Sequence, residues 1–195
     1  MRYGLVVIGT SAGGLAALER LLGGLPADFP LPLLIVQHRS RESDVLCEVL
    51  AARTRLPVRE VLDKEPIEPG VVFLAPPDYH VLVDEASFSL SSDEPVRFAR
   101  PSIDVSFHSA ADAFGARLVG VILTGANEDG ASGLRRVQEE GGLALVQDPA
   151  EAEVARMPAA AVAAVPAARR LPLIELAAAL RAAAAETVTI AGGRA

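Results

Sequence analysis

Short apolar runs alternate along this chain with amphipathic segments, and glycine or proline stands at most of the changes between them. A run that is apolar at every position predicts a strand buried on both faces, as in a parallel sheet. Such strands are predicted at residues 5–8, 33–36, 119–123 and 143–146. Helices with one apolar stripe are predicted at about residues 15–22, 42–54, 102–116 and 131–140, and further helices in the alanine-rich residues 159–185.

This alternation of strands and helices predicts an α/β fold with a doubly wound, mostly parallel sheet and helices on both faces. A different pattern covers residues 62–98, where proline, glycine and aspartate turns separate short β-like pieces at 71–75, 80–83 and 87–90. We interpret these pieces as an antiparallel β-hairpin insertion. A length of 195 residues suits one domain over 1–195, with frayed final residues.

Composition excludes several classes of protein. Apolar residues make up 51% of the chain, but no run reaches the eighteen or so residues of a membrane span. The first apolar run has no basic segment before it, unlike a signal peptide. The single cysteine, Cys47, excludes an internal disulfide framework and a cysteine-rich metal site. We therefore expect a cytoplasmic protein without membrane insertion.

The charge and the aromatic content bear on partners. A net charge of −7, with two tyrosines and no tryptophan, argues against nucleic-acid binding, which depends on neutralising phosphates and stacking on bases. The three histidines are scattered and have no cysteine or glutamate at ligand spacing. We expect no metal and no cofactor.

Gly9-x-Ser11-x-Gly13 lies on the predicted turn from the first strand to the first helix. This turn presents either a nucleophilic serine or a phosphate cradle. A dinucleotide site also requires G-x-G-x-x-G and an acid at the end of the second strand, where this chain has Gln37-His38. No Walker lysine follows the turn, so nucleotide binding is disfavoured.

Ser11, His38 and Asp129 each follow a predicted core strand. Because sites form at the carboxyl ends of parallel strands, these side chains are placed as a serine triad requires. Each residue also has a simpler interpretation. Ser11 can be an ordinary residue of a glycine-rich turn, and His38 can be a loop histidine that faces solvent. Asp129 can be the N-cap of the helix predicted from residue 131. His80 can face the same cleft or solvent. His108 lies inside a predicted helix and is expected to be packed or to have its hydrogen bonds satisfied.

Six ordered motifs resemble those of the chemotaxis receptor methylesterases, the CheB-type catalytic domain. The resemblance spans nearly the whole chain. The motifs are the serine segment 8–14, Val36-Gln37-His38, Ala75-Pro76-Pro77-Asp78-Tyr79-His80, the Arg-Pro-Ser segment 100–109, the aspartate segment 120–130, and Met157-Pro158.

The resemblance implies Ser11 as nucleophile, His38 as general base and then acid, and Asp129 as the orienting carboxylate. It implies hydrolysis of glutamyl methyl esters on chemoreceptor cytoplasmic helices, and family members also deamidate receptor glutamines. We expect the oxyanion to rest on backbone N–H groups of Ala12 and of the 124–127 loop. The chain departs from the family pattern at Ala12, usually threonine, and at Ala126, usually methionine, which changes the pocket wall.

Arg100 is a cation next to a turn, and we expect it to hold an acidic receptor segment or else to pair with Asp78 or Asp104. Typical family members carry an N-terminal receiver domain, which we expect to be absent here because the first strand begins near Met1. Control would then be absent, or would come from another chain such as a separate response regulator or methyltransferase. Two other functions remain open: a non-catalytic regulatory binding module on the same scaffold, and a serine hydrolase for small esters.

Overall fold

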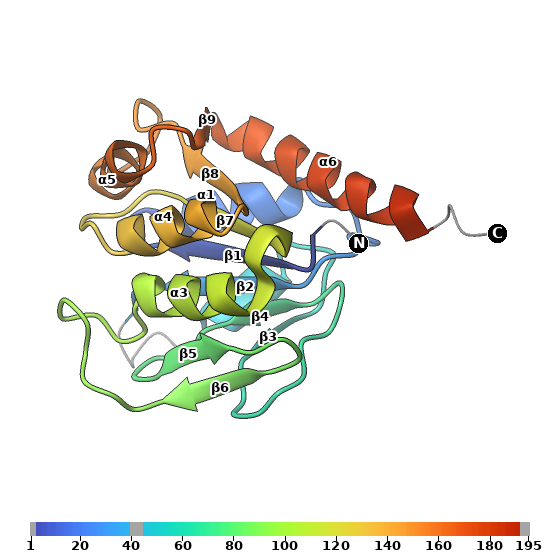
Figure 1. Ribbon diagram of the computed structural model, residues 1–195, viewed down its shortest axis with the longest axis horizontal. Helices are drawn as coiled ribbons and strands as arrows, with labels where there is room; N and C mark the ends of the chain where they lie inside the picture. Colours follow the sequence, from blue (N-terminus) through green and yellow to red (C-terminus); the bar gives the residue numbers. More distant parts are fainter. Residues whose placement is uncertain (1–2, 40–44, 192–195) are drawn as a thin grey trace.

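The structure, a computed structural model, describes residues 3–39 and 45–191, with side chains described through 186. In these ranges a seven-stranded sheet with the order β3-β4-β2-β1-β7-β8-β9 forms the centre, and all its strand pairs are parallel (Figure 1). Its strands are β1 (Leu5–Thr10), β2 (Leu33–Gln37), β3 (Val58–Glu60), β4 (Val72–Leu74), β7 (Leu118–Ile122), β8 (Leu143–Gln147) and β9 (Arg169–Leu171).

Helices cover both faces of this sheet. One layer holds α1 (Gly14–Gly23), α2 (Leu46–Ala51) and α6 (Leu173–Ala191). The other holds α3 (Ile103–Phe114), α4 (Ala131–Glu139), α5 (Arg156–Ala164) and the antiparallel hairpin of β5 (His80–Val83) and β6 (Phe88–Ser91). A short 3₁₀ helix, η1 (Gly115–Arg117), joins α3 to β7.

Each central strand contributes side chains to both layers of the core. In β1, Val6 and Ile8 pack into the core under α1 and α6, whereas Leu5 and Val7 pack into the core under α3. Because successive side chains of a strand point to opposite faces, a strand covered on both sides is apolar at every position. The predicted doubly wound α/β class is confirmed.

The prediction that residues 71–75 belong to the antiparallel insertion is wrong. They form β4, which lies between β3 and β2 in the parallel sheet. Val72, Phe73 and Leu74 are all fully buried, which is the two-sided burial of a parallel strand. Only β5 and β6 form the predicted hairpin, in a separate two-stranded sheet.

The sheet also continues beyond the strand predicted at residues 143–146, because a further strand, β9, pairs with β8. The edge strand β9 follows α5 and carries Arg169 and Arg170, both exposed, so it shows no apolar run. Helix α2 is shorter than the predicted helix at 42–54, since it spans Leu46–Ala51, and residues 42–44 lie outside the described ranges. The predicted fraying at 192–195 also lies outside them.

The central strands end together at one edge of the sheet, and this alignment positions the candidate site. Thr10 at the end of β1 is in register with Gln37 at the end of β2. On the other side of β1, the N–H of Ser11 donates to the carbonyl of Thr124 (3.0 Å). The loops that follow β1, β2 and β7 therefore start side by side at the carboxyl edge of the sheet (Figure 1).

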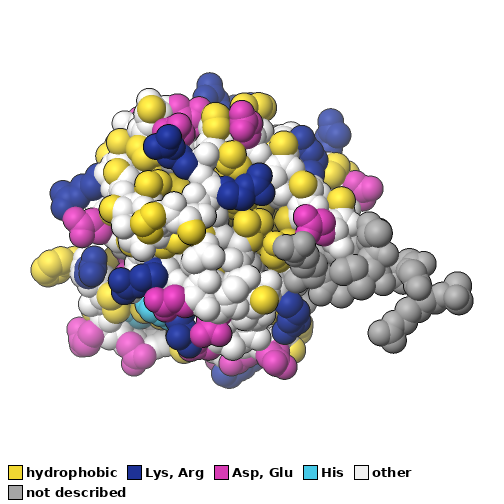
Figure 2. Space-filling view, turned by 45° about the horizontal axis from the view of Figure 1, so that its top comes forward, with side chains coloured by type: hydrophobic (Ala, Val, Ile, Leu, Met, Phe, Trp, Pro, Cys, Tyr) yellow, Lys and Arg dark blue, Asp and Glu magenta, His cyan; other side chains and the backbone are white. Residues whose placement is uncertain are grey.

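Two further features are the apolarity of the helices and the distribution of charge on the surface. Within the described residues, no helix combines the length and apolarity needed to cross a bilayer. On the face shown in Figure 2, acidic and basic side chains are interspersed with apolar ones.

Candidate active site

Ser11 follows β1 directly and begins the tight turn into α1. The N–H of Gly14 donates to the carbonyl of Ser11 (2.9 Å), and Gly13, the residue before the helix, has a φ of +75°. A Cβ on Gly13 would lie 2.8 Å from Cβ of Glu153, so both the backbone angle and the space require glycine. The turn holds the serine at the edge of the sheet, beside the N-terminus of α1.

His38 lies beside Ser11 because the two residues follow neighbouring, in-register strands. The N–H of His38 continues the ladder by donating to the carbonyl of Thr10 (3.2 Å). Paired strands are about 4.8 Å apart, so the backbones at Ser11 and His38 are adjacent. The two side chains, both in the described part of the chain, make no hydrogen bond to each other.

Asp129 is fully buried at the N-terminus of α3 and accepts four hydrogen bonds. The donors are His38 Nε2 (2.7 Å) and the N–H of Ile103 (2.7 Å) to Oδ2, and Ser102 Oγ (2.9 Å) and the N–H of Asp104 (3.0 Å) to Oδ1. Two of these donors are backbone N–H groups of the first helical turn, which have no partner within the helix.

The surroundings of Asp129 set its protonation state. Burial by itself would raise its pKa, but the hydrogen bonds from His38 and from the N–H groups of Ile103 and Asp104 lower it below its usual value. Asp129 is therefore an anion with a fixed position. The simpler interpretation of Asp129 as a cap of the next helix needs correction, because the carboxylate binds the start of α3, and Gly130 is the N-cap residue of α4.

The carboxylate of Asp104, on α3, caps the N-terminus of α4 in the same way. Its Oδ1 accepts the N–H groups of Gly130 (3.0 Å) and Gly133 (2.7 Å) at the N-terminus of α4. Burial raises the pKa of Asp104, in part against these hydrogen bonds. Helices α3 and α4 thus cap each other, each through a carboxylate supplied at the start of the other.

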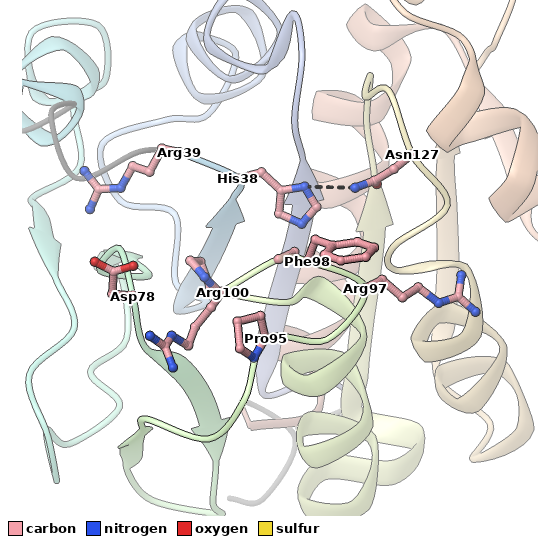
Figure 3. A pocket seen from close by; sticks show the side chains of 10 residues that line it. His38, Arg39, Asp78, Pro95, Arg97, Phe98, Arg100 and Asn127 are labelled. Atoms are coloured by element: carbon pink, nitrogen blue, oxygen red, sulfur yellow. Dashed lines mark hydrogen bonds between the residues drawn. The ribbon is translucent and has the colours of Figure 1, made fainter.

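The contacts of His38 fix its tautomer. Nε2 lies against the anionic Asp129, which only accepts, so Nε2 carries the proton. The other ring nitrogen, Nδ1, lies 3.3 Å from Nδ2 of Asn127 (Figure 3). The Asn127 amide is itself oriented, because its Oδ1 accepts the N–H of Asp129 (3.1 Å). Nδ1 is therefore the basic nitrogen, and it faces the loops rather than the carboxylate.

Thr124 connects the loops that carry the expected oxyanion donors. Its carbonyl accepts Thr10 Oγ1 (2.9 Å), and its own Oγ1 donates to the carbonyl of Ala12 (2.9 Å). The N–H groups of Ala12 and Ala126 have no acceptor among the residues that the structure describes. Both predicted donors are available to a ligand.

A cavity of about 550 Å³ opens beside His38 (Figure 3). Its lining is rich in cations and comes from the loops around β2, β5, α3 and β7: His38, Arg39, Asp78, Pro95, Arg97, Phe98, Ala99, Arg100, Pro101 and Asn127. Ser11 is not among the residues that line this cavity, and it lies next to His38 at the end of β1.

Arg100 lies in the cavity wall, where Nη1 donates to the carbonyls of Ser92 and Asp93 (3.0 Å each). The alternative pairing with Asp104 does not form in the described structure, where the Asp104 carboxylate binds the start of α4. Arg100 thus braces the loop after β6 and still borders the cavity.

Arg97 and Phe98 form the tip of that loop, a feature that the sequence did not indicate. Val96 and Ala99 pair through two backbone hydrogen bonds (3.1 and 2.9 Å), and the two residues between them have φ of +49° and +66°. This is the backbone of a two-residue hairpin that normally carries Asn-Gly. Phe98 is fully exposed at this tip.

The remaining histidines have other roles. His80 is buried, its Nδ1 accepts the N–H of Ser102 (3.1 Å) and its Nε2 donates to the carbonyl of Glu94 (3.2 Å). It supports the residue that binds Asp129 and does not enter the cavity. His108 is exposed rather than packed in the core, and its Nε2 lies 3.3 Å from Ser132 Oγ, so of the two expectations only that of a hydrogen-bonded histidine agrees with the structure. In the described part of the chain, no three His, Cys, Asp or Glu side chains are grouped to hold a metal ion.

Comparison with known proteins gives a consistent picture. The model of the CheB methylesterase family matches residues 6–180. A Leptospira interrogans protein is 47% identical over 164 residues, 83% of this chain and 85% of its own length. The Thermotoga maritima CheB methylesterase catalytic domain superimposes with a TM-score of 0.88 at 30% identity, covering 92% of this chain and 98% of that domain.

Two longer relatives are named protein-glutamate methylesterase/protein-glutamine glutaminase. One, of a group 3 operon in Pseudomonas putida, is 43% identical over 83% of this chain. The other, number 2 of Anaeromyxobacter dehalogenans, is 43% identical over 92% of this chain. The match spans 49% and 53% of those two proteins, about half their length.

Proposed function

This chain belongs to the CheB methylesterase family, and from that premise and the site geometry we propose that it hydrolyses glutamate methyl esters on chemoreceptor cytoplasmic helices. The proposed substrate is a methylated glutamate side chain presented by a helical receptor segment in the cytoplasm. The products are a glutamate side chain and methanol.

The proposed reaction proceeds through an acyl-enzyme. His38 Nδ1 takes the proton of Ser11 Oγ as that oxygen attacks the ester carbonyl. The negative oxygen of the tetrahedral intermediate accepts hydrogen bonds from Ala12 N–H and one N–H of the 124–127 loop, in which Ala126 is an available donor. Each such donor contributes roughly 2.7–4 kcal/mol to the transition state.

The C–O bond to the methoxy group then breaks, and His38 returns its proton to that oxygen, releasing methanol. A water molecule is deprotonated by His38 and attacks the acyl carbonyl, and Ser11 Oγ leaves with the proton. In both steps Asp129 stabilises the imidazolium and holds the ring. Its lowered pKa supports this role, because an anion is needed there throughout.

The observation that carries the proposal is the His38–Asp129 hydrogen bond of 2.7 Å, located beside Ser11 at in-register strand ends. We predict that Ser11→Ala abolishes methanol release from methylated receptor helices, because it removes the oxygen that is proposed to form the acyl-enzyme. Ser132→Ala, which removes a hydroxyl on α4, is the matched control and should retain activity. Near-normal methanol release by Ser11→Ala would refute the assignment.

Two other functions give different outcomes in simple assays. A non-catalytic binding module on the same scaffold would leave Ser11 of the folded protein unlabelled by a fluorophosphonate probe, whereas the proposed nucleophile is labelled. A hydrolase for small esters would prefer p-nitrophenyl esters to the methylated receptor peptide.

Deamidation of glutamine is a second proposed activity of the same site. The relatives from Pseudomonas putida and Anaeromyxobacter dehalogenans carry the name glutaminase as well as methylesterase. The chemistry is the same acyl transfer with ammonia as the leaving group. A separate response regulator or methyltransferase is the proposed regulatory partner.

A further inference from the structure

Asn127 is the one asparagine of the chain, and it contacts the proposed general base directly. It lies two residues before Asp129 in the loop after β7, and its side chain lines the cavity beside His38 (Figure 3). No step of the proposed mechanism uses it.

Its orientation is determined by a backbone contact. Oδ1 accepts the N–H of Asp129, so the other end of the amide, the donor Nδ2, faces His38. On the opposite side of the ring, Nε2 donates to the carboxylate of Asp129. The imidazole therefore lies between an acceptor at Nε2 and a donor at Nδ1, and only the neutral tautomer with a free lone pair on Nδ1 satisfies both.

We propose that Asn127 is a positioning residue that keeps His38 in this basic tautomer in the resting enzyme and releases Nδ1 to Ser11 when substrate binds. An imidazolium would direct an N–H from Nδ1 at the N–H₂ of Asn127, which is unfavourable. The same amide competes with the Ser11 hydroxyl for the Nδ1 lone pair, consistent with the missing Ser11–His38 hydrogen bond. The inference rests on the proposed esterase function.

The other charged groups near the His38 ring are the same in the wild type and in a variant of Asn127. Asp129 contacts Nε2, and the cavity that His38 borders is lined by further charged side chains, namely Arg39, Asp78, Arg97 and Arg100. None of these changes when Asn127 is substituted. A change in pH dependence can then be assigned to the contact at Nδ1.

Asn127→Asp is the sharpest variant because it keeps the oxygen that accepts the Asp129 N–H and replaces the donor at Nδ1 by an anionic acceptor. In the pH profile of kcat/KM for p-nitrophenyl acetate, the acid limb should shift to higher pH by about one unit or more, because a carboxylate at Nδ1 favours the imidazolium. Asn127→Leu removes the donor without adding charge, and its acid limb should move up by less. A purely structural role would lower kcat or stability and leave both limbs unmoved, which would overturn the proposal.

A second measurement needs neither substrate nor variant. Protein labelled with ¹⁵N in histidine and asparagine has a single asparagine side-chain signal, while His80 and His108 serve as internal references. We expect His38 Nδ1 to resonate as an unprotonated nitrogen at neutral pH, and the Asn127 amide signal to follow the His38 titration. A protonated Nδ1 in the resting enzyme would refute the proposal, whatever the receptor assay shows.

Discussion

At the scale of single residues, Asp129 holds His38 through a hydrogen bond and contributes to the stability of the fold at acid pH. Its lowered folded-state pKa means that its ionised form stabilises the fold above its ordinary value of about 3.9, and that this stabilisation disappears as pH falls through the lowered pKa. Asp129→Asn removes the titration and places an N–H₂ against donors, so it should cost about 3 kcal/mol near neutral pH.

Urea unfolding at a series of pH values tests this. The stability difference between the wild type and Asp129→Asn should narrow as the pH falls below about pH 4. A difference that widens toward low pH would mean that the folded-state pKa of Asp129 is raised.

Sites in parallel sheets form at the carboxyl ends of the strands, and this rule predicted from sequence that Ser11, His38 and Asp129 lie at one edge of the sheet. The structure places them at that edge. The rule does not resolve side-chain contacts. That Asp129 caps α3 follows from a backbone approach between residues 26 positions apart. Asn127 carried a local signal, an asparagine two residues before an aspartate, but nothing in that spacing indicates which histidine nitrogen it meets.

At the scale of elements, the mutual capping of α3 and α4 depends on oxygen acceptors but not equally on charge. In Asp104→Asn, Oδ1 can still accept the N–H groups of Gly130 and Gly133, and a carboxylate whose pKa is raised by burial is removed. We predict a change in unfolding free energy within about 0.5 kcal/mol. Asp104→Leu leaves both N–H groups without an acceptor and should cost about 3 kcal/mol.

Thermal unfolding measures this contrast, with about 2–4 °C expected per kcal/mol for a chain of this size. Asp112→Asn is the matched control, because Asp112 lies on the same helix and is exposed in a surface ion pair with Arg136. Equal losses for Asp104→Asn and Asp104→Leu would show that the charge, not the acceptor, stabilises the helix start.

The elements that were not predicted correctly from the sequence have no distinctive pattern of apolar residues. β4 is as buried as β1, but its three residues stand among proline and glycine turns, so its partner could not be chosen from the pattern. β9 is an edge strand with exposed arginines and gives no apolar run. The left-handed pair Arg97-Phe98 has none of the glycine or asparagine that such a turn favours, so the residue types did not indicate the turn.

At the scale of the whole molecule, two electrostatic effects on an acidic substrate oppose each other. The chain carries 18 Lys and Arg against 25 Asp and Glu, a net charge of −7 that repels an acidic receptor helix. The cavity beside His38 is lined by Arg39, Arg97 and Arg100 and by one carboxylate, Asp78. Arg39 forms an ion pair with Glu60 and Arg97 lies 3.9 Å from Glu128, whereas Arg100 binds backbone carbonyls. At physiological ionic strength the Debye length is about 8 Å, so the cavity arginines act on a docked segment while more distant acids are screened.

We therefore predict that raising salt from about 0.05 to 0.5 M lowers kcat/KM for an acidic methylated receptor helix several-fold and leaves hydrolysis of neutral p-nitrophenyl acetate nearly unchanged. Arg100→Ala should raise KM for the helix and flatten its salt dependence. Arg135→Ala, on α4 in an ion pair with Glu139, is the matched loss of one cation and should keep the wild-type slope. If kcat/KM rises with salt instead, the net negative charge dominates the encounter, and the arginines of the cavity wall serve only to brace their loops.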